Sequence, residues 1–268
     1  YEYFIRHSAG LGKSPTEKDP DIYDHKYVHC DVLVVGAGIS GILAAKNAAK
    51  NNLKTLLVDE KNEIGGSTIY QNREFNKIEN QSSSDWLKKE IQELRNIKNL
   101  EIKTRTSVAA FHGYNYLLAR ENLTDHLEKK DKKGKIRQRL LKIRAKKVIL
   151  ATGALERPLI FNNNDRPGIM LSSAVKKYAD FYGVVSGKKN IFFTNNDSAY
   201  ESAFCLHNKG IKVEAIIDIR ESSNSKIVKA VEEAGIKIYW SSTIVDTTGY
   251  KRLNSISVMK LSNDGLSV

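Results

Sequence analysis

The chain has 268 residues, 41% of them apolar, and carries a formal net charge of +12. This composition suits a globular protein of one or two domains, and no apolar run approaches the length of a membrane span or reads as a secretory signal. The charge suggests nucleic acid as a partner. However, the lysines alternate with acids and lack interleaved arginines and aromatic residues, so we expect a solvated lysine-rich surface with no nucleic-acid or membrane partner.

The two cysteines, Cys30 and Cys205, lie far apart in the chain. They form neither a disulfide framework nor a C-x-x-C pair, which predicts a reducing, cytoplasmic setting and excludes a mechanism based on a redox-active dithiol. The six histidines show neither metal-ligand spacing nor a partnered nucleophile. We therefore expect no metal site, and the sequence identifies no catalytic residue.

The first 29 residues show no clean hydrophobic period, and glycines and prolines interrupt them. We expect an extended lead-in that packs over the following domain. The chain begins with Tyr1 rather than Met, and it stops in a polar run directly after an alternating strand pattern at 256–259. These ends predict a piece of a longer protein.

Residues 31–60 contain the most informative motif of the first half. An apolar strand ending at Val35 runs into G-A-G-I-S-G, and an alanine-rich amphipathic helix follows, which is the context that a dinucleotide-binding fingerprint requires. Gly36 permits the sharp turn, Gly38 lets backbone amides approach a pyrophosphate, and Gly41 lets the helix pack closely on the strand. We expect the phosphates at the helix N-terminus, where free N–H groups and the macrodipole favour anions.

An acid for the ribose follows a second apolar strand over 53–58. Asp59 stands where a carboxylate accepts hydrogen bonds from ribose hydroxyls, and it disfavours a 2′-phosphate, so we expect NAD or FAD rather than NADP. The alternative is an ordinary βαβ unit whose glycines serve packing alone. A glycine doublet at 65–66, followed by Ser67, is expected to start a helix beside the cofactor.

The rest of the first half is predicted to contain a helix over 86–94, a strand over 100–104 and a β-meander built from 109–118 and 137–145. We expect the loop 105–108 to lay its backbone against an adenine. The apolar strand 147–150 ends in Ala-Thr-Gly at 151–153, which is typical of the point where the sheet of a nucleotide-binding domain approaches its cofactor.

The second half repeats the βαβ plan. Its predicted elements are a strand over 190–193, a helix over 198–208 and a strand over 213–219. Alignment on the first unit sets Thr194, Asn196 and Ala199 against the three fingerprint glycines. The larger residues hinder close approach of the backbone to a pyrophosphate, so a second nucleotide is not expected. We expect Asn195, Asn196 and Asp197 to cap the helix.

These elements together predict an α/β protein with two Rossmann-like, three-layer domains, the second inserted in the first, and with a β-meander in the first. The predicted boundaries are 1–29 for the lead-in, 30–160 for the first dinucleotide-binding domain and 161–268 for a degenerate second domain. We expect the segment that completes the first domain to lie beyond the end of the chain.

Several phrases resemble the α subunit of heterotetrameric sarcosine oxidases, in a region related to pyridine nucleotide-disulfide oxidoreductases. They are H-C-D-V-L-V-V-G at 29–36, K-I-R-A-K at 142–146, A-T-G-A-L-E-R-P at 151–158, N-N-D-R-P-G at 163–168 and T-N-N-D-S-A-Y at 194–200. The likeness runs over nearly the whole chain, and the last two phrases are far more specific than the glycine fingerprint.

The resemblance implies a complex that oxidises sarcosine to glycine, with hydrogen peroxide and with formaldehyde or methylene-tetrahydrofolate as further products. It implies β, γ and δ subunits as partners, FAD and the amine-oxidising site on the β subunit, and FMN between α and β. This chain would be a non-catalytic part that binds NAD. FAD stays open as an alternative in this chain, because both cofactors use the same glycines and the same acid, and a related amine such as dimethylglycine stays open as the substrate.

The NAD site of the family, carried onto matching positions, gives the candidate cofactor-binding residues. Those expected around the pyrophosphate are Gly36, Gly38, Ser40 and Gly41; those near the adenosine ribose are Asp59, Glu60 and Lys61; further contacts are expected at Ser67, Val108, Thr152 and Gly153. Lys61 stands where arginine is common in the family, which keeps the charge but not a forked or stacked contact. Glu60 reads equally well as a solvated turn residue.

Two other functions are carried as alternatives. An independent FAD-dependent NAD(P)H oxidoreductase without a redox-active disulfide would need an intact second fingerprint, against which Thr194 and Asn196 argue. A basic, non-enzymatic binding module would bind nucleic acid in a salt-sensitive manner. The sequence ranks both below the nucleotide-binding part of a sarcosine oxidase complex.

Overall fold

The structure is a computed structural model that describes residues 1–12, 16–70, 77–265 and 267–268. The chain divides into two compact units. Unit 1 comprises Tyr1–Ile64 and Leu94–Thr152, and unit 2 comprises Gly65–Glu93 and Gly153–Val268. Residues 65–93, which the predicted boundaries place in the first domain, therefore group with unit 2. The insertion of one domain in the other stays a prediction.

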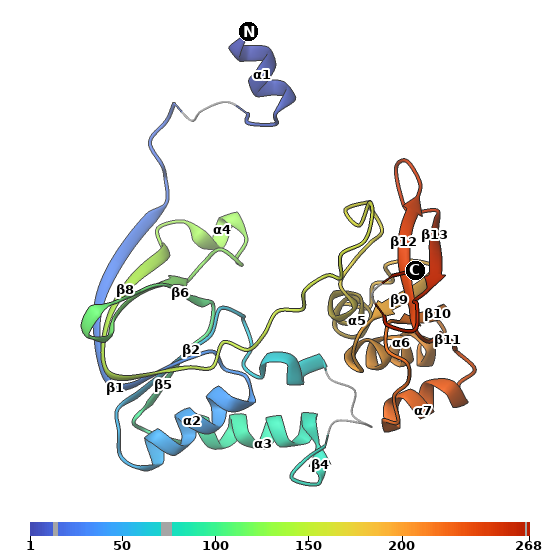
Figure 1. The fold of residues 1–268 in the computed structure, drawn as a ribbon. Helices are drawn as coiled ribbons and strands as arrows, with labels where there is room; N and C mark the ends of the chain where they lie inside the picture. Colours follow the sequence, from blue (N-terminus) through green and yellow to red (C-terminus); the bar gives the residue numbers. More distant parts are fainter. Residues whose placement is uncertain (13–15, 71–76, 266) are drawn as a thin grey trace. The chain divides into compact units, whose positions relative to one another are not determined.

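Unit 1 is built on a six-stranded sheet in the order β5-β2-β1-β8-β7-β6 (Figure 1). Its strands are β1 (Ile22–Val35), β2 (Thr55–Val58), β5 (Leu100–Lys103), β6 (Thr106–His112), β7 (Tyr116–Asn122) and β8 (Ile136–Leu150). The pairs of β1 with β2, β1 with β8 and β2 with β5 are parallel, whereas β6, β7 and β8 pair antiparallel. The predicted α/β class and the predicted β-meander are confirmed.

The short helical elements of unit 1 are α1 (Glu2–Ser8), α2 (Ile39–Lys50), the 3₁₀ turn η2 (Gly113–Asn115) and α4 (Lys129–Lys132). β8 joins into one strand the two segments that the sequence predicts separately at 137–145 and 147–150. Its first part pairs with both β7 and β1, and its last part pairs with β1. β8 is therefore a member of the meander and of the parallel sheet at once.

β1 begins at Ile22, inside the stretch predicted as an extended lead-in, and α1 lies there too. The first half of β1 pairs with β8, and Arg139 Nε donates a hydrogen bond of 2.9 Å to the Asp24 carboxylate. Most side chains of this half are exposed on both faces. A strand of this kind lacks the alternation that marks a half-buried strand, so the pattern could not reveal it.

Alternation along the second half of β1 divides the core of unit 1 into two clusters. Val32 and Val34 pack against α2 on one face of the sheet. Leu33 and Val35 pack with side chains of β7 and β8 on the other face. A strand covered on both faces is apolar at every position, which is why this segment reads as a continuous apolar run.

Unit 2 contains a three-stranded parallel sheet in the order β11-β10-β9. Its strands are β9 (Lys189–Thr194), β10 (Lys212–Asp218) and β11 (Lys237–Tyr239), and its helices are α5 (Ser172–Phe181), α6 (Ser198–Asn208) and α7 (Lys226–Glu233). The remaining elements are η1 (Gly66–Tyr70), the strand pair β3 (Lys77–Ile78) and β4 (Gln81–Ser82), the hairpin β12 (Ser242–Thr248) and β13 (Ser255–Lys260), and α3 (Ser83–Arg95) apart from its last two residues, which belong to unit 1. The predicted strand–helix–strand of this half agrees with β9, α6 and β10.

A buried acid fixes the position of α6 on this sheet. Asp218, the last residue of β10, is completely buried, and so is Tyr200 of α6. The Tyr200 hydroxyl donates a hydrogen bond of 2.7 Å to the Asp218 carboxylate, and Arg220 Nη2 lies 2.7 Å from the same oxygen. Burial, and then this hydrogen bond, raise the pKa of Tyr200. A buried carboxylate keeps its charge only when it is paired and hydrogen-bonded, so the network holds α6 and β10 together.

Removal of the Tyr200 hydroxyl tests this network. We expect Tyr200→Phe to lower the free energy of unfolding by about 1–3 kcal/mol, because a buried charged acceptor loses a donor. Tyr250→Phe is the matched control, since Tyr250 is 91% exposed. Denaturant unfolding of the two variants provides the measurement, and equal midpoints would contradict the role of the hydrogen bond.

Candidate functional site

The candidate site begins where β1 ends. Gly36 has a φ of +99°, and a Cβ at this position would collide with the carbonyl group of Ala151, the residue after β8. Gly41 lies in the first turn of α2, and a Cβ there would collide with the carbonyl oxygen of Gly36. Both positions therefore require glycine, one for the turn and one for the close approach of the helix. These are the structural roles that the sequence predicts for them.

The N-terminus of α2 is open. Gly38 is the N-cap residue, with an extended backbone, and its carbonyl oxygen accepts the 2.9 Å hydrogen bond from Ile42 N–H. No side chain caps this end, the first turn holds no acid, and the Ser40 side chain is exposed. The first N–H groups of a helix have no partner within the helix and carry a partial positive charge, so the turn and the helix end fit a pyrophosphate.

Asp59 fastens the glycine loop to the end of β2. One of its carboxylate oxygens accepts a 2.6 Å hydrogen bond from Ala37 N–H, and the other accepts a 2.8 Å hydrogen bond from Lys61 N–H. Asp59 is 9% exposed, whereas the neighbouring Glu60 is exposed. Sequence reasoning assigned Asp59 to the ribose alone and missed this bracing role, for which an acid at a strand end gives no separate signal.

Backbone hydrogen bonds align the carboxyl ends of the parallel strands. Ala151 N–H donates to Val35 at 2.8 Å, Gly36 N–H donates to Val58 at 2.8 Å, and Asp59 N–H donates to Lys103 at 2.9 Å. Ligands of open α/β sheets bind at this edge. The chain therefore places the glycine loop and the acids on one edge of the sheet.

Unit 1 brings together most of the predicted site residues at this edge: Gly36, Gly38, Ser40, Gly41, Asp59, Glu60, Lys61 and the exposed Thr152. Val108 is the third residue of β6, shortly after the loop that follows β5, and its side chain is partly buried. Ser67 lies in η1, and it belongs to unit 2, as does Gly153. The helix predicted after the glycine doublet is this short 3₁₀ element.

The loop between β9 and α6 is closed by its own side chains. The Thr194 hydroxyl accepts a 3.1 Å hydrogen bond from Asn196 N–H, and Asn196 Oδ1 accepts one of 3.0 Å from Ser198 N–H. Asn196 therefore caps α6 as predicted. Asp197 stands at the N-cap position as predicted, but its side chain makes no capping hydrogen bond and pairs with Arg220 Nη1 at 2.8 Å. Asn195 Oδ1 accepts a hydrogen bond from Asn196 Nδ2.

The two units use the acid at the end of their second strand differently. Asp59 and Asp218 each accept a hydrogen bond from the N–H two residues further on, Lys61 in one case and Arg220 in the other. The second oxygen of Asp59 then holds the glycine loop, whereas that of Asp218 is bound by Tyr200 and Arg220. The shared turn supports a common plan for the two units, and the different partners distinguish an open loop from a filled one.

The cysteines lie in different units and are both buried. Burial raises the pKa of Cys30 to about 11, and it also raises the pKa of Cys205. Neither thiol is therefore an activated nucleophile at neutral pH. Within the described ranges, no cluster of three or more histidine, cysteine or acidic side chains could hold a metal ion, and no helix is long and apolar enough to cross a membrane.

The parallel sheet with a glycine turn between its first strand and helix defines the class of dinucleotide-binding α/β proteins. The sequence profile of the pyridine nucleotide-disulphide oxidoreductase family matches residues 30–266, and the chain belongs to this family.

Within that family the chain is similar to sarcosine oxidase subunit alpha. It is 39% identical to that of Corynebacterium sp. (strain P-1) over 257 residues, which are 95% of this chain and 26% of the relative. It is 36% identical to that of Rhizobium meliloti (strain 1021) over 259 residues, which are 96% of this chain and 25% of the relative. The resemblance predicted from the sequence is confirmed, and the chain spans about a quarter of the length of these relatives.

Two solved structures show the same fold. The L-proline dehydrogenase from P. horikoshii has a TM-score of 0.61 at 21% identity, over 88% of this chain and 41% of that one. The thioredoxin reductase of T. acidophilum has a TM-score of 0.59 at 17% identity, over 86% of this chain and 70% of that one. The likeness concerns the fold alone.

The steric requirement at the turn can be separated from the cost of its backbone conformation. Gly134 also has a positive φ, +73°, but a Cβ there meets nothing within 4 Å. We expect Gly134→Ala to cost about 1 kcal/mol of unfolding free energy for the conformation alone. Gly36→Ala is expected to cost about 1–3 kcal/mol more, because Ala151 must move. Urea unfolding of both variants measures the difference, and equal costs would contradict the collision.

Proposed function

We propose that this chain is the nucleotide-binding part of a sarcosine oxidase α subunit and that it holds one NAD at the glycine loop of unit 1. The observation that carries the proposal is the cradle between Gly36, Gly41 and the uncapped end of α2. Free N–H groups and the helix dipole stabilise a pyrophosphate there. The similarity to sarcosine oxidase alpha subunits supports this choice among the many functions of the fold.

The residues of the site take distinct roles in this proposal. Gly36, Gly38, Ser40 and Gly41 surround the pyrophosphate, Lys61 lies near the adenosine ribose, and further contacts come from Ser67, Val108, Thr152 and Gly153. Glu60 accepts hydrogen bonds from the adenosine ribose, since its carboxylate is exposed. Asp59 contributes to the same ribose site mainly as a brace, because each of its oxygens already accepts a backbone N–H.

The amine chemistry is assigned to another subunit. In this proposal sarcosine is oxidised at FAD on a β subunit to give glycine, hydrogen peroxide and formaldehyde or methylene-tetrahydrofolate, with FMN between α and β. NAD, when bound, supplies a nicotinamide ring able to exchange a hydride. The chain's own residues bind and orient the dinucleotide in a cytoplasmic heterotetramer with β, γ and δ subunits. We also propose that the chain forms two Rossmann-like domains, with the second inserted in the first.

The alternative is an independent FAD-dependent NAD(P)H oxidoreductase. Such an enzyme needs a second dinucleotide in unit 2, close to the loop between β9 and α6. The side chains of Thr194 and Asn196 already bind the N–H groups of this loop, and Arg220 spans Asp197 and Asp218 at its edge. These contacts favour a single nucleotide.

The identity of the bound nucleotide tests the proposed function directly. The full-length protein, purified with the subunits that accompany it, is denatured, and the released nucleotides are identified by chromatography and mass. We expect one NAD for each copy of this subunit, with the flavins traced to other subunits. FAD released from this subunit alone, together with turnover of NAD(P)H, would establish the alternative instead.

The ribose contact makes a second prediction. Glu60→Gln removes the charged acceptor, so we expect NAD to bind about tenfold more weakly in the full-length protein, with unchanged thermal unfolding in the absence of NAD. Glu63→Gln is the matched control, because Glu63 is also exposed and lies three residues further on. Equal affinities of the two variants, measured by calorimetric titration, would remove Glu60 from the site.

A further inference from the structure

Three strands of unit 1 share a sheet face that carries cations and tyrosines but no acid. Paired residues of neighbouring strands project to the same side of a sheet, and alternate residues project to the other side. The register of β1 with β8 and of β8 with β7 therefore places nine side chains on one side, which we call the basic face: His25, Tyr27 and His29, then Leu140, Lys142 and Arg144, then Arg120, Leu118 and Tyr116. On the other side, Leu141, Ile143, Leu117 and Ala119 are completely buried.

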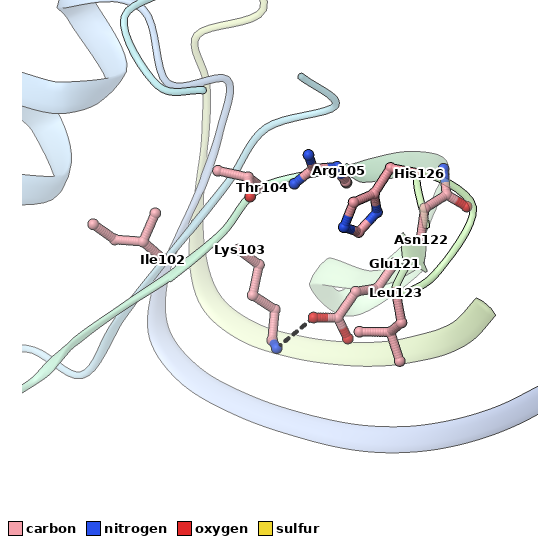
Figure 2. A pocket seen from close by; sticks show the side chains of 8 residues that line it. All are labelled: Ile102, Lys103, Thr104, Arg105, Glu121, Asn122, Leu123 and His126. Atoms are coloured by element: carbon pink, nitrogen blue, oxygen red, sulfur yellow. Dashed lines mark hydrogen bonds and ion pairs between the residues drawn. The ribbon is translucent and has the colours of Figure 1, made fainter. Parts of the chain in front are cut away.

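The acids that adjoin the basic face in sequence project to that other side. Asp24 and Glu121 both pair with Arg139, whose Nε donates a 2.9 Å hydrogen bond to Asp24 and whose Nη1 lies 3.7 Å from Glu121 Oε2. Lys103 Nζ lies 2.8 Å from the other oxygen of Glu121 (Figure 2). These acids are thus neutralised on their own side of the sheet, and the basic face keeps its positive charge.

Tyrosines and a backbone carbonyl hold two cations of the basic face in place. Lys142 Nζ lies 4.9 Å from the centre of the Tyr27 ring and 3.4 Å from its hydroxyl oxygen. The Arg144 guanidinium lies 5.0 Å from the centre of the Tyr116 ring, and its Nη1 donates a 3.1 Å hydrogen bond to the Tyr114 carbonyl oxygen. Neither cation makes an ion pair with any residue that the structure describes. Because their positions are fixed in advance, they lose little conformational entropy when they bind an anionic group.

A hollow lies at one end of the basic face. It has a volume of about 370 Å³, and its lining includes His29 and Arg144 of that face together with Asp31, Lys54 and Lys146. The Asp31 carboxylate is already occupied, since it accepts a 2.8 Å hydrogen bond from Lys54 N–H and lies 2.8 Å from Lys146 Nζ. The Lys54 ammonium makes no hydrogen bond or ion pair within the described ranges. An acidic side chain in the hollow would therefore meet the cations of Lys54 and Arg144.

The composition of the basic face selects a class of partner. Tyrosine and arginine are enriched at protein–protein interfaces, and here Tyr27 is 64% exposed and Leu140 is 39% exposed. Nucleic-acid bases would need free aromatic rings for stacking, whereas Lys142 and Arg144 already lie over the rings of Tyr27 and Tyr116. Carboxylates form strong hydrogen bonds with ammonium and guanidinium groups, and the net charge of +12 attracts an acidic protein.

We propose that the basic face docks an acidic surface of another protein. Aspartates and glutamates of that protein bind Lys142 and Arg144, and one acidic side chain occupies the hollow beside Lys54. The apolar side chains of Leu118 and Leu140 lie between the cations and are covered in the same contact. This inference does not rest on the proposed function, because no residue of the basic face belongs to the candidate nucleotide site.

Carbodiimide cross-linking tests the contact. The full-length protein, purified with the proteins that accompany it and treated with nuclease, is exposed to a water-soluble carbodiimide. The reagent takes up water to become a urea as a lysine amine and a touching carboxylate condense to an amide. We expect mass spectrometry to find Lys142 or Lys54 joined to an aspartate or glutamate of another polypeptide. The cross-link should disappear in about 1 M salt, which screens charges within a few ångströms.

Lys142→Gln tests the role of the basic face, and Lys26→Gln is its matched control. Lys26 is also exposed and adjoins Tyr27, but it pairs with Leu141 on the other side of the sheet. We expect Lys142→Gln to weaken binding of the cross-linked protein about tenfold, with an unchanged midpoint of denaturation, and Lys26→Gln to leave binding unchanged.

Three results would overturn the inference. The first is equal binding by the two variants, which would show a response to net charge alone or no role for the face. The second is a preparation in which neither Lys142 nor Lys54 forms a cross-link, or forms one only within this polypeptide. The third is loss of the accompanying protein on nuclease treatment, which would assign the basic face to a nucleic acid.

Discussion

The register of β1 between β2 and β8 is the constraint on which the rest of unit 1 depends. Val35 pairs with Val58 on one side and with Leu150 on the other, so three carboxyl ends stop together. The glycine turn then fits between them, and Asp59 reaches the backbone of Ala37. A slip by one residue would exchange the β1 side chains that pack against α2 with those that pack against β7 and β8, and it would separate the turn from its acid. Burial of the strand thus fixes the position of the site.

The two units share a strand–helix–strand arrangement, but the acid at the end of the second strand has different partners in each. In unit 1 the acid after the second strand binds backbone, which leaves the loop free of side chains. In unit 2 the corresponding Asp218 binds Tyr200 and Arg220, and the loop is occupied by hydroxyl and amide groups. The first arrangement keeps N–H groups available to a ligand, whereas the second uses them for stability. Fold similarity alone therefore does not establish a nucleotide site in each unit.

Sequence patterns predicted the elements whose signal is local. The glycine turn, α6 and the strands beside it follow from apolar runs and from glycine positions. The first half of β1 was missed because its exposed side chains carry no alternation, and its partner β8 is distant in sequence. The bracing role of Asp59 depends on a contact between the ends of two strands, which no local pattern encodes. Long-range pairing is the part of the site that sequence reasoning could not supply.

Arg220 ties Asp218 to Asp197 across the end of β10 and the start of α6. Exchange of Thr194 for glycine would leave this bridge in place, and loss of Arg220 alone would deprive a completely buried carboxylate of its cation. Loss of Arg220 therefore lowers stability, whereas exchange of Thr194 alone leaves the ion pairs beside the loop in place. An open phosphate loop in unit 2 would thus require changes at Thr194, Asn196 and Arg220 together, because each of the three side chains occupies a different part of the loop or its edge.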